Sequence, residues 1–220
     1  MQTGPYRPPK DGMPLWVAFW RMAHAVRPLL TARLEYEGIE HMPLTGGAVL
    51  ASNHNMGPDY FSLALTSPRQ HFYMAKEEAF NFHPIVTYSL HNTGVFPVKR
   101  GIGDIGALQG AIDKVKEGHV VGMYPEGTRS RDGQLQKGKS GTVRIAMAAQ
   151  APIIPAATIN SQYILKLTKR PVVTVRYGEP LWFEGDPNDR ELVRQYTHEM
   201  MVTIARLLPP ELRGVYRDKV

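Results

Sequence analysis

The stretch AVLASNHNMGPD, residues 48–59, contains the signals of a strand, a loop and a helix start in succession. Its first four residues, Ala48–Ala51, form an uninterrupted apolar run, which is typical of a strand buried on both faces. Pro58 can open a helix, because its fixed φ angle suits the first helical turn. His54 therefore falls where a strand gives way to a loop, and Asp59 falls near the start of the next helix. A carboxylate there can hold the imidazole from behind, so the pair is a candidate general base with an orienting partner.

The rest of the chain alternates between short apolar runs and segments with helical spacing. Strands are predicted over residues 34–37, 48–52, 72–75, 120–124, 153–158 and 172–177, and a short extended stretch over 95–98. Helices are predicted over residues 58–67, 77–82, 84–93, 104–117, 142–150 and 188–208. Asn188 and Glu191 have the spacing of a capping box at the start of the last helix. This alternation predicts an α/β sandwich with a mixed, mostly parallel central sheet, formed by one domain over residues 34–220.

The composition favours an anionic partner. The chain has 26 basic and 20 acidic residues, a net charge of +6. Phosphorylated metabolites, coenzyme A, acidic lipid surfaces and nucleic acid all fit such an excess. The chain has no cysteine, which excludes disulfides, thiolate metal sites and a cysteine nucleophile. No metal site is predicted, because the eight histidines show no convincing ligand spacing.

Residues 1–33 are predicted to form an N-terminal arm and a membrane-interface helix. Residues 14–30, PLWVAFWRMAHAVRPLL, are too few and too charged to span a bilayer, which takes about 20 apolar residues. Trp16, Phe19 and Trp20 fall near one helical face and cations fall on another, as in helices that lie in a membrane interface. We therefore expect these three side chains to contact an anionic membrane. The alternative is an ordinary amphipathic helix packed on its own domain.

Two polar stretches follow apolar segments. Lys99 and Arg100 follow the extended run at 95–98, and adjacent cations beside a glycine can grip a phosphate, although they can equally form a solvated surface pair. The run PEGTRSRDG, residues 125–133, offers backbone N–H groups, hydroxyls and guanidinium groups directly after a strand. This combination favours an anion pocket.

An apolar stretch with two prolines lies farther along the chain. It consists of Pro152, Ile153, Ile154 and Pro155. Such a composition predicts a wall rather than a site of chemistry. The wall could line a pocket for an acyl chain, or it could be structural and pack within the core.

Four motifs together resemble those of the glycerolipid acyltransferases. They are Asn53-His54 with Asp59, FPVKR at 96–100, PEGTRS at 125–130 and PIIP at 152–155. The nearest relatives that they suggest are the 1-acyl-glycerol-3-phosphate (lysophosphatidic acid) acyltransferases. The resemblance covers most of the chain and implies a glycerol-3-phosphate acyltransferase-like αβ sandwich, with His54 as the base and Asp59 as its partner. It also implies a phosphate-binding set for the acceptor, namely Lys99, Arg100, Glu126, Gly127, Thr128, Arg129, Ser130 and Lys137.

The implied reaction moves a long-chain acyl group from an acyl-CoA, or from an acyl carrier protein thioester, to the free hydroxyl of lysophosphatidic acid. Glycerol-3-phosphate or another lysolipid is an alternative acceptor. Transfer is direct and needs no cofactor beyond the thioester co-substrate. The protein is then expected to be peripheral, on the cytoplasmic side of the cell membrane, with no nucleic-acid partner.

Two readings of another class remain open. Residues Gly133–Ser140, GQLQKGKS, satisfy the phosphate-binding loop pattern of nucleotide-binding enzymes. Such a loop should follow a buried strand directly, whereas the nearest predicted strand ends at Tyr124. A non-enzymatic membrane-binding module would explain Trp16, Trp20 and the positive charge. It would leave the His54/Asp59 pair without a role.

Overall fold

The computed structural model describes residues 12–26, 33–55, 57–81, 83–98, 103–164 and 172–220. Within these residues, seven strands form one sheet in the order β1-β7-β6-β2-β5-β3-β4. Every neighbouring pair is parallel except β6 and β7. The predicted α/β fold with a mixed, mostly parallel sheet is therefore confirmed. The strands are β1 (Arg33–Glu37), β2 (Ala48–Ser52), β3 (His71–Lys76), β4 (Val95–Val98), β5 (Val120–Met123), β6 (Ile153–Ile159) and β7 (Val172–Tyr177).

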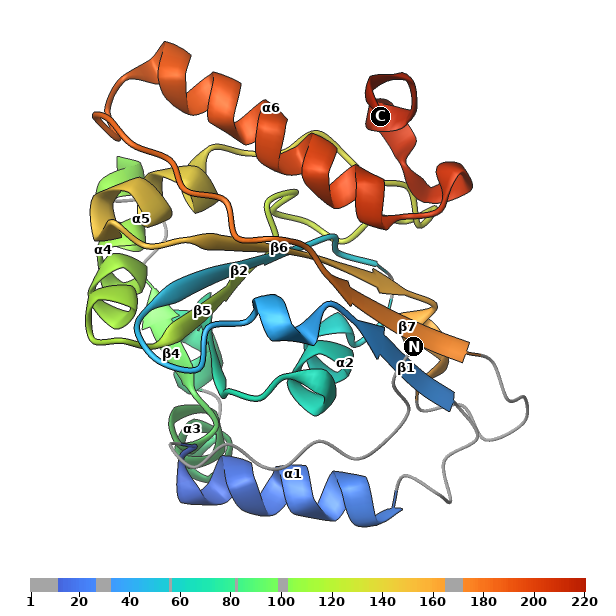
Figure 1. The fold of residues 1–220 in the computed structure, drawn as a ribbon. Helices are drawn as coiled ribbons and strands as arrows, with labels where there is room; N and C mark the ends of the chain where they lie inside the picture. The colour runs from blue at the N-terminus through green and yellow to red at the C-terminus, as the bar shows by residue number, and fades with distance from the viewer. Residues whose placement is uncertain (1–11, 27–32, 56, 82, 99–102, 165–171) are drawn as a thin grey trace.

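Helices cover both faces of this sheet (Figure 1). The described helices are α1 (Pro14–Val26), α2 (Asp59–Thr66), α3 (Pro84–Asn92), α4 (Gly103–Lys116), α5 (Gly141–Ala149) and α6 (Arg190–Leu207). Short 3-10 helices are η2 (Ile39–His41), η3 (Glu77–Phe80), η4 (Ser161–Tyr163), η5 (Pro210–Leu212) and η6 (Gly214–Lys219). The helix predicted at 77–82 is thus the 3-10 helix η3. These elements agree with the sequence predictions apart from such local differences.

Strand β2 lies in the middle of the sheet and is buried from both sides. Val49 and Ala51 belong to the core formed with α4, α5 and α6. Ala48 and Leu50 belong to the opposite core, which includes side chains of α1 and α2. All five residues of β2 are buried. An uninterrupted apolar run is the pattern that such a strand requires, because both of its faces meet apolar layers.

Helix α1 packs on the domain with its indole side chains turned inward. Trp16 and Trp20 are only 5% and 4% exposed. Phe19 is half-buried and lies edge-on against Phe61 of α2, with ring centroids 5.5 Å apart. The predicted membrane contact by Trp16 and Trp20 is therefore wrong for this structure, because their apolar area is already removed from solvent by the domain. None of the helices in the described part of the chain is long and apolar enough to cross a membrane.

The capping residue of α6 differs from the prediction by one position. Asp189 accepts hydrogen bonds from the backbone N–H groups of Glu191 and Leu192, at 3.0 and 3.1 Å. Asn188 lies one residue before this cap, and its backbone and side-chain N–H groups both donate to Asp186. The predicted capping box at Asn188 is therefore wrong. A carboxylate at Asp189 satisfies two free N–H groups and lies at the positive end of the helix dipole.

We expect Asp189→Ala to lower the free energy of unfolding by about 1 kcal/mol, because α6 loses its N-cap. The matched control Asn188→Ala removes only an exposed contact outside the helix, and it should cost less than half as much. Urea denaturation followed by circular dichroism measures both values. Equal losses in the two variants would contradict the assignment of the cap.

Candidate active site

The site lies where three neighbouring parallel strands end. β2 pairs in parallel with both β5 and β6, so their carboxyl ends meet at one edge of the sheet. His54 follows β2, Glu126 follows β5, and Thr158 lies near the end of β6. Open α/β sheets commonly bind ligands outside this edge, because loops from several strands converge there. The fold thus brings together residues that are about a hundred positions apart in the chain.

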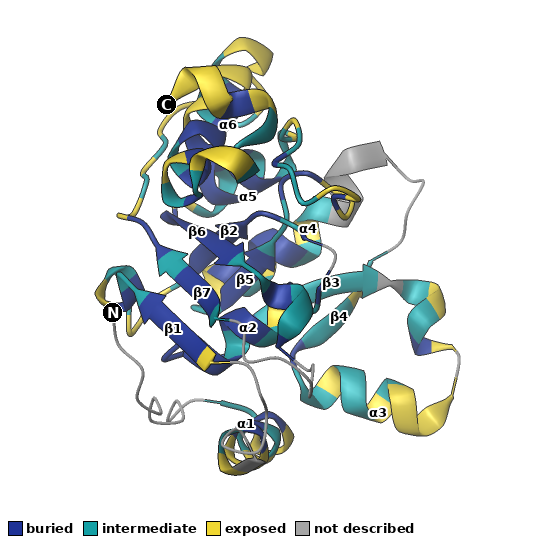
Figure 2. Ribbon diagram, turned by 90° about the vertical axis from the view of Figure 1, so that its right-hand side faces the viewer, coloured by how far each residue is buried: buried dark blue, intermediate teal, exposed yellow. Residues whose placement is uncertain are grey.

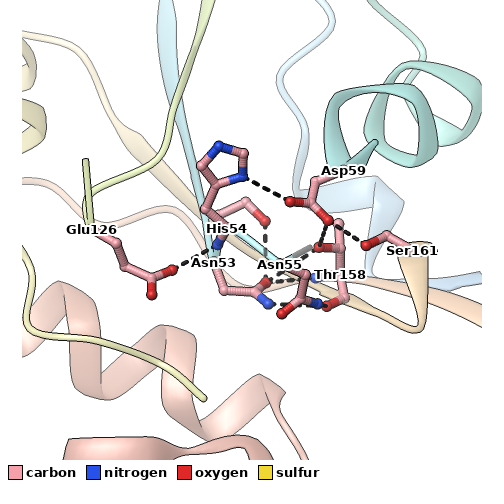
Figure 3. A network of polar contacts seen from close by, with 8 residues as sticks. Asn53, His54, Asn55, Asp59, Glu126, Thr158 and Ser161 are labelled. Atoms are coloured by element: carbon pink, nitrogen blue, oxygen red, sulfur yellow. Dashed lines mark hydrogen bonds and ion pairs between the residues drawn. The ribbon is translucent and has the colours of Figure 1, made fainter. Parts of the chain in front are cut away.

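His54 and Asp59 are in direct contact, as the sequence pattern predicted (Figure 3). Asp59 is the first residue of α2 and is 0% exposed, and its Oδ2 lies 2.8 Å from His54 Nδ1. This contact assigns the imidazole proton to Nδ1, which leaves Nε2 as the acceptor. The His54 side chain is 17% exposed, so the pair is reachable from only part of its surroundings. The arrangement can remove a proton from a hydroxyl that reaches Nε2.

Gly57, in the loop between His54 and Asp59, is in close contact with another segment of the chain. Gly57 packs against the backbone of Ser161 and Gln162, and a Cβ at Gly57 would lie 2.3 Å from the amide nitrogen of Gln162. No side chain fits at Gly57 unless one of the two backbones moves. The close approach explains why a glycine stands between His54 and Asp59.

The second oxygen of Asp59 is held by residues at the end of β6 and just beyond it. Its Oδ1 accepts a hydrogen bond from Ser161 Oγ and another, at 3.3 Å, from Thr158 Oγ1. Asn53 pairs with Thr158 at two points, because its side chain accepts from the Thr158 N–H and donates to the Thr158 carbonyl, at 2.8 and 3.0 Å. The sequence analysis assigned no role to Thr158 or Ser161. No local pattern marks them, since their partners lie about a hundred residues earlier.

Tyr124, the first residue after β5, covers one face of the imidazole. Its ring is stacked on His54, with centroids 4.0 Å apart and an angle of 14° between the ring planes. Tyr73 continues the stack, with centroids 6.2 Å from Tyr124. Gly122 leaves room for Tyr73, because a Cβ there would lie 2.2 Å from the Tyr73 ring. Burial raises the pKa of Tyr124 well above its usual value, so its phenol remains neutral beside the histidine.

Both carboxyl oxygens of Glu126, which the sequence analysis assigned to phosphate binding, are bonded by backbone N–H groups. Its Oε1 accepts from the His54 backbone N–H at 2.6 Å, and its Oε2 accepts from the Gln136 backbone N–H at 2.9 Å. The carboxyl group is buried, and it connects the loop after β2 to two points of the loop after β5. Burial raises its pKa to about 7, although the two N–H groups favour the ionised form.

The other predicted phosphate-binding residues are divided by the structure. Gly127 has a left-handed φ of 70°, and it is exposed together with Thr128 and Arg129. The side chains of Thr128 and Arg129 make no hydrogen bond within the described part of the chain. Ser130 is buried; its hydroxyl donates to Asp132 at 2.9 Å, and its N–H donates to the His54 carbonyl at 2.8 Å. Ser130 therefore supports the loop instead of facing a ligand.

Of the three remaining cations of the predicted phosphate site, only Lys137 lies within the described residues. Lys137 lines a different cleft of about 670 Å³, between its own loop and α6, together with Arg144 and Arg190. Lys99 and Arg100 lie outside the described residues.

The predicted acyl-chain wall is part of the protein core. All four of its residues are buried, namely Pro152, Ile153, Ile154 and Pro155. The two isoleucines lie in the two cores on opposite faces of the sheet. Both prolines are held by the sheet, because the Pro152 carbonyl accepts from the Val49 N–H at 2.9 Å and the Pro155 carbonyl accepts from the Gly178 N–H at 2.8 Å. The acyl-pocket role predicted for Pro152 and Pro155 is therefore not matched by their surroundings, which fit the structural alternative.

The phosphate-binding loop pattern is not matched by the structure. Strand β5 ends at Met123, and the loop 125–132 intervenes before Gly133. The Lys139 backbone N–H donates to the Pro125 carbonyl at 2.8 Å. Its side chain lies against Gly127, where a Cβ would be 2.7 Å from Lys139 Nζ. The lysine side chain is thus packed on Gly127, in the loop after β5.

The raised pKa of Glu126 predicts a dependence of stability on pH. An unfolded glutamate loses its proton near pH 4.5, whereas folded Glu126 keeps it up to about pH 7. Wild-type stability should therefore fall as pH rises from about 4.5 to about 7, by roughly 2–3 kcal/mol relative to Glu126→Gln, which stays neutral throughout. Urea denaturation at several pH values measures this difference. Parallel stability curves for the two proteins would contradict the burial effect.

Comparisons with known proteins show which family the chain resembles. An acyltransferase family model matches residues 33–159. The chain is 34% identical over 163 residues to a 1-acyl-sn-glycerol-3-phosphate acyltransferase of Bacillus subtilis (strain 168), covering 72% of this chain and 80% of that protein. It is 29% identical over 136 residues to the chloroplastic 1-acyl-sn-glycerol-3-phosphate acyltransferase BAT2 of Brassica napus, covering 60% of this chain but only 39% of that protein.

A solved structure has the same fold. The crystal structure of the 1-acyl-sn-glycerophosphate (LPA) acyltransferase from Thermotoga maritima matches with a TM-score of 0.65 and 23% identity, covering 86% of this chain and 77% of that one. The family model spans more than half of the chain and includes His54, Asp59 and Glu126. These matches support an acyltransferase over the nucleotide-binding and non-enzymatic alternatives. The chain belongs to the acyltransferase family.

Proposed function

We propose that this protein transfers a long-chain acyl group from an acyl-CoA thioester to the free hydroxyl of 1-acyl-glycerol-3-phosphate, giving phosphatidic acid. The observation that carries the proposal is the contact of 2.8 Å between His54 Nδ1 and the buried Asp59. With the Nδ1 proton directed at Asp59, Nε2 is the imidazole nitrogen that can accept a proton from a substrate hydroxyl. The names of the relatives in Bacillus subtilis and Brassica napus support the choice of acceptor.

In the proposed mechanism, His54 Nε2 takes the proton of the acceptor hydroxyl as its oxygen attacks the thioester carbonyl carbon. A new ester C–O bond forms, and the C–S bond then breaks. The imidazolium returns its proton to the leaving sulfur, which departs as the thiol. Asp59 holds the tautomer and stabilises the imidazolium during the transfer. No covalent acyl-enzyme is needed, so the residues act by position and charge.

Arg129 is the proposed ligand of the acceptor's phosphate among the described residues. It is exposed on the loop after β5, where Gly127 turns the backbone and Thr128 offers a hydroxyl. Ser130, next in the chain, is fixed to the His54 carbonyl. A guanidinium here can form two parallel hydrogen bonds with a phosphate. Lys99 and Arg100 are proposed as further cations of this site.

We further propose that the protein is peripheral at the cytoplasmic face of the cell membrane. Exposed apolar side chains on α1 and α3 support this: Leu15, Met22, Ile85, Val86 and Tyr88. We call them the α1–α3 surface. Both helices lie on the same side of the sheet (Figure 2), and α1 contacts both α2 and α3. No residue of α3 is buried. Apolar groups of this kind bind a lipid surface by leaving water.

The charge of the N-terminal region fits the same partner. Residues 1–32 contain Arg7, Lys10, Arg21 and Arg27 but only one acidic residue, Asp11. Such a balance attracts anionic lipid headgroups. A lysolipid acceptor resides in the membrane, and α2, which carries Asp59, lies beside α1. The α1–α3 surface would therefore present the site to lipid substrates.

We expect His54→Ala to lower acyl transfer by at least about 100-fold, because the general base is lost. The assay is thiol release from palmitoyl-CoA with and without lysophosphatidic acid, and glycerol-3-phosphate serves as the alternative acceptor. The control His119→Ala removes an imidazole outside the site and should retain wild-type activity. Full activity in His54→Ala would contradict the role of His54 as the base. If the wild type releases thiol only with glycerol-3-phosphate, the acceptor is glycerol-3-phosphate and not lysophosphatidic acid.

The α1–α3 surface predicts the effect of charge on membrane binding. Met22→Glu with Ile85→Glu should reduce cosedimentation with vesicles containing anionic phospholipids, because carboxylates resist transfer into an apolar interface. The control Trp182→Glu changes a residue that is as exposed (65%) as Ile85 (70%) but lies between β7 and α6. It should bind vesicles like wild type. Equal binding by all three proteins would exclude this surface as the contact.

A further inference from the structure

The segment that follows β6 reaches the candidate catalytic pair. Asn160 has a left-handed φ of 61° and ends the strand. Its side chain donates to the Val172 carbonyl at 3.1 Å, which ties the turn to β7. The chain then enters η4 at Ser161, which is fully buried. Asparagine tolerates this backbone conformation better than most residues, so the turn can aim Ser161 back toward the sheet.

Ser161 is directed at the one oxygen of Asp59 that His54 does not use (Figure 3). Thr158 adds a second contact, at 3.3 Å, to the same oxygen. A carboxylate removed from water needs such donors to remain ionised. The backbone around Ser161 also packs on Gly57, within the loop that joins His54 to Asp59. Both observations place η4 directly behind the pair.

The geometry points to Ser161 as a positioning residue of the acyl transfer, with Thr158 as a second donor. The Ser161 hydroxyl holds Asp59 Oδ1 so that Oδ2 stays aligned with His54 Nδ1, and it limits how strongly the imidazole retains a proton. This inference rests on the proposed role of His54 and Asp59. It assigns a role to a residue that lies beyond the segment matched by the family model, residues 33–159.

The direction of the effect follows from charge. In the wild type, a hydroxyl proton from Ser161 withdraws part of the negative charge of Asp59. Without it, more of that charge faces the imidazole, which then binds a proton more tightly. His54 must be unprotonated to act as a base, so the active fraction should fall at low pH. A greater mobility of the Asp59 side chain should also lower kcat. The KM for the acceptor should change little, because Ser161 is fully buried.

Other titratable groups surround the pair. Glu126 contacts the His54 backbone, Tyr124 is stacked on the ring, and Tyr73 lies behind Tyr124. Tyr60 follows Asp59 on α2, and its side chain is exposed. Burial raises the pKa of Tyr73 and of Tyr124, so both phenols stay neutral. Glu126 is common to all variants, and its titration therefore cancels when they are compared.

The test compares Ser161→Ala with Thr158→Val and with a matched control, Ser62→Ala. Ser62 lies on α2, is fully buried, and its hydroxyl has no hydrogen-bond partner among the described residues. Two readouts are taken on the full-length protein. The first is the pH profile of kcat/KM for thiol release with palmitoyl-CoA and lysophosphatidic acid. The second is the NMR titration of the His54 imidazole, identified by its absence from His54→Gln.

In Ser161→Ala, we expect kcat to fall about tenfold with the acceptor KM within about twofold of wild type, since a hydrogen bond to a charged group is lost. The acid limb of the profile and the midpoint of the His54 titration should both move to higher pH. Thr158→Val should shift them in the same direction by less, because its contact of 3.3 Å is long for a hydrogen bond between two oxygens. Ser62→Ala should leave both at their wild-type positions.

A purely structural role gives a different result. Ser161→Ala would then lower the melting temperature but leave the His54 midpoint and the acid limb where Ser62→Ala has them, and this outcome overturns the inference. If Ser161→Ala does not fold, an unshifted midpoint in Thr158→Val overturns it. A wild type without acceptor-dependent thiol release would reject the proposed function, whereas the titration would still decide how Ser161 acts on His54.

Discussion

The buried carboxylate of Asp59 is the constraint on which the arrangement of this site depends. At 0% exposure it has no water to solvate its charge, so protein groups must do so. His54, in the loop after β2, bonds one oxygen of Asp59. Ser161 and Thr158 bond the other oxygen, and they lie 102 and 99 residues after Asp59 in the chain. These three segments meet only because β2 and β6 are neighbouring parallel strands in a defined register. The geometry of the candidate base therefore depends on the pairing of β2 with β6.

A second buried carboxylate, Glu126, organises the backbone around the same histidine. It accepts one N–H group from His54 and one from Gln136, which ties the loop after β5 to the loop after β2. Ser130 adds a hydrogen bond from its N–H group to the His54 carbonyl. The exposed Thr128 and Arg129 lie in the chain between these two points of attachment to the His54 backbone. The two carboxylates thus differ in role: Asp59 acts on the imidazole, and Glu126 acts on the main chain.

Much of the fold was predictable, because strands buried on both faces must be apolar throughout and helices carry apolar residues at regular spacing. The contacts of side chains were harder to predict. The aromatic face of α1 suits a lipid interface and a protein core equally well, and the packing of Trp16 and Trp20 on the domain decides for the core. The same ambiguity held for Pro152 and Pro155, whose apolar rings suit an acyl pocket or a core, and their burial within the sheet again decides for the core. Apolar composition alone does not say what covers a surface.

The sequence by itself determined the α/β class, the mostly parallel sheet and the closeness of His54 to Asp59, because each depends on patterns a few residues long. It also carried the resemblance to the acyltransferases, since the four motifs keep their order along the chain. Only the tertiary structure decided that Glu126 bonds the main chain of two loops, that Ser130 supports its own loop, and that Thr158 and Ser161 donate hydrogen bonds to Asp59. Those roles depend on which buried donor meets which acceptor across the sheet. Partners so far apart in the chain leave no local pattern by which a sequence could reveal them.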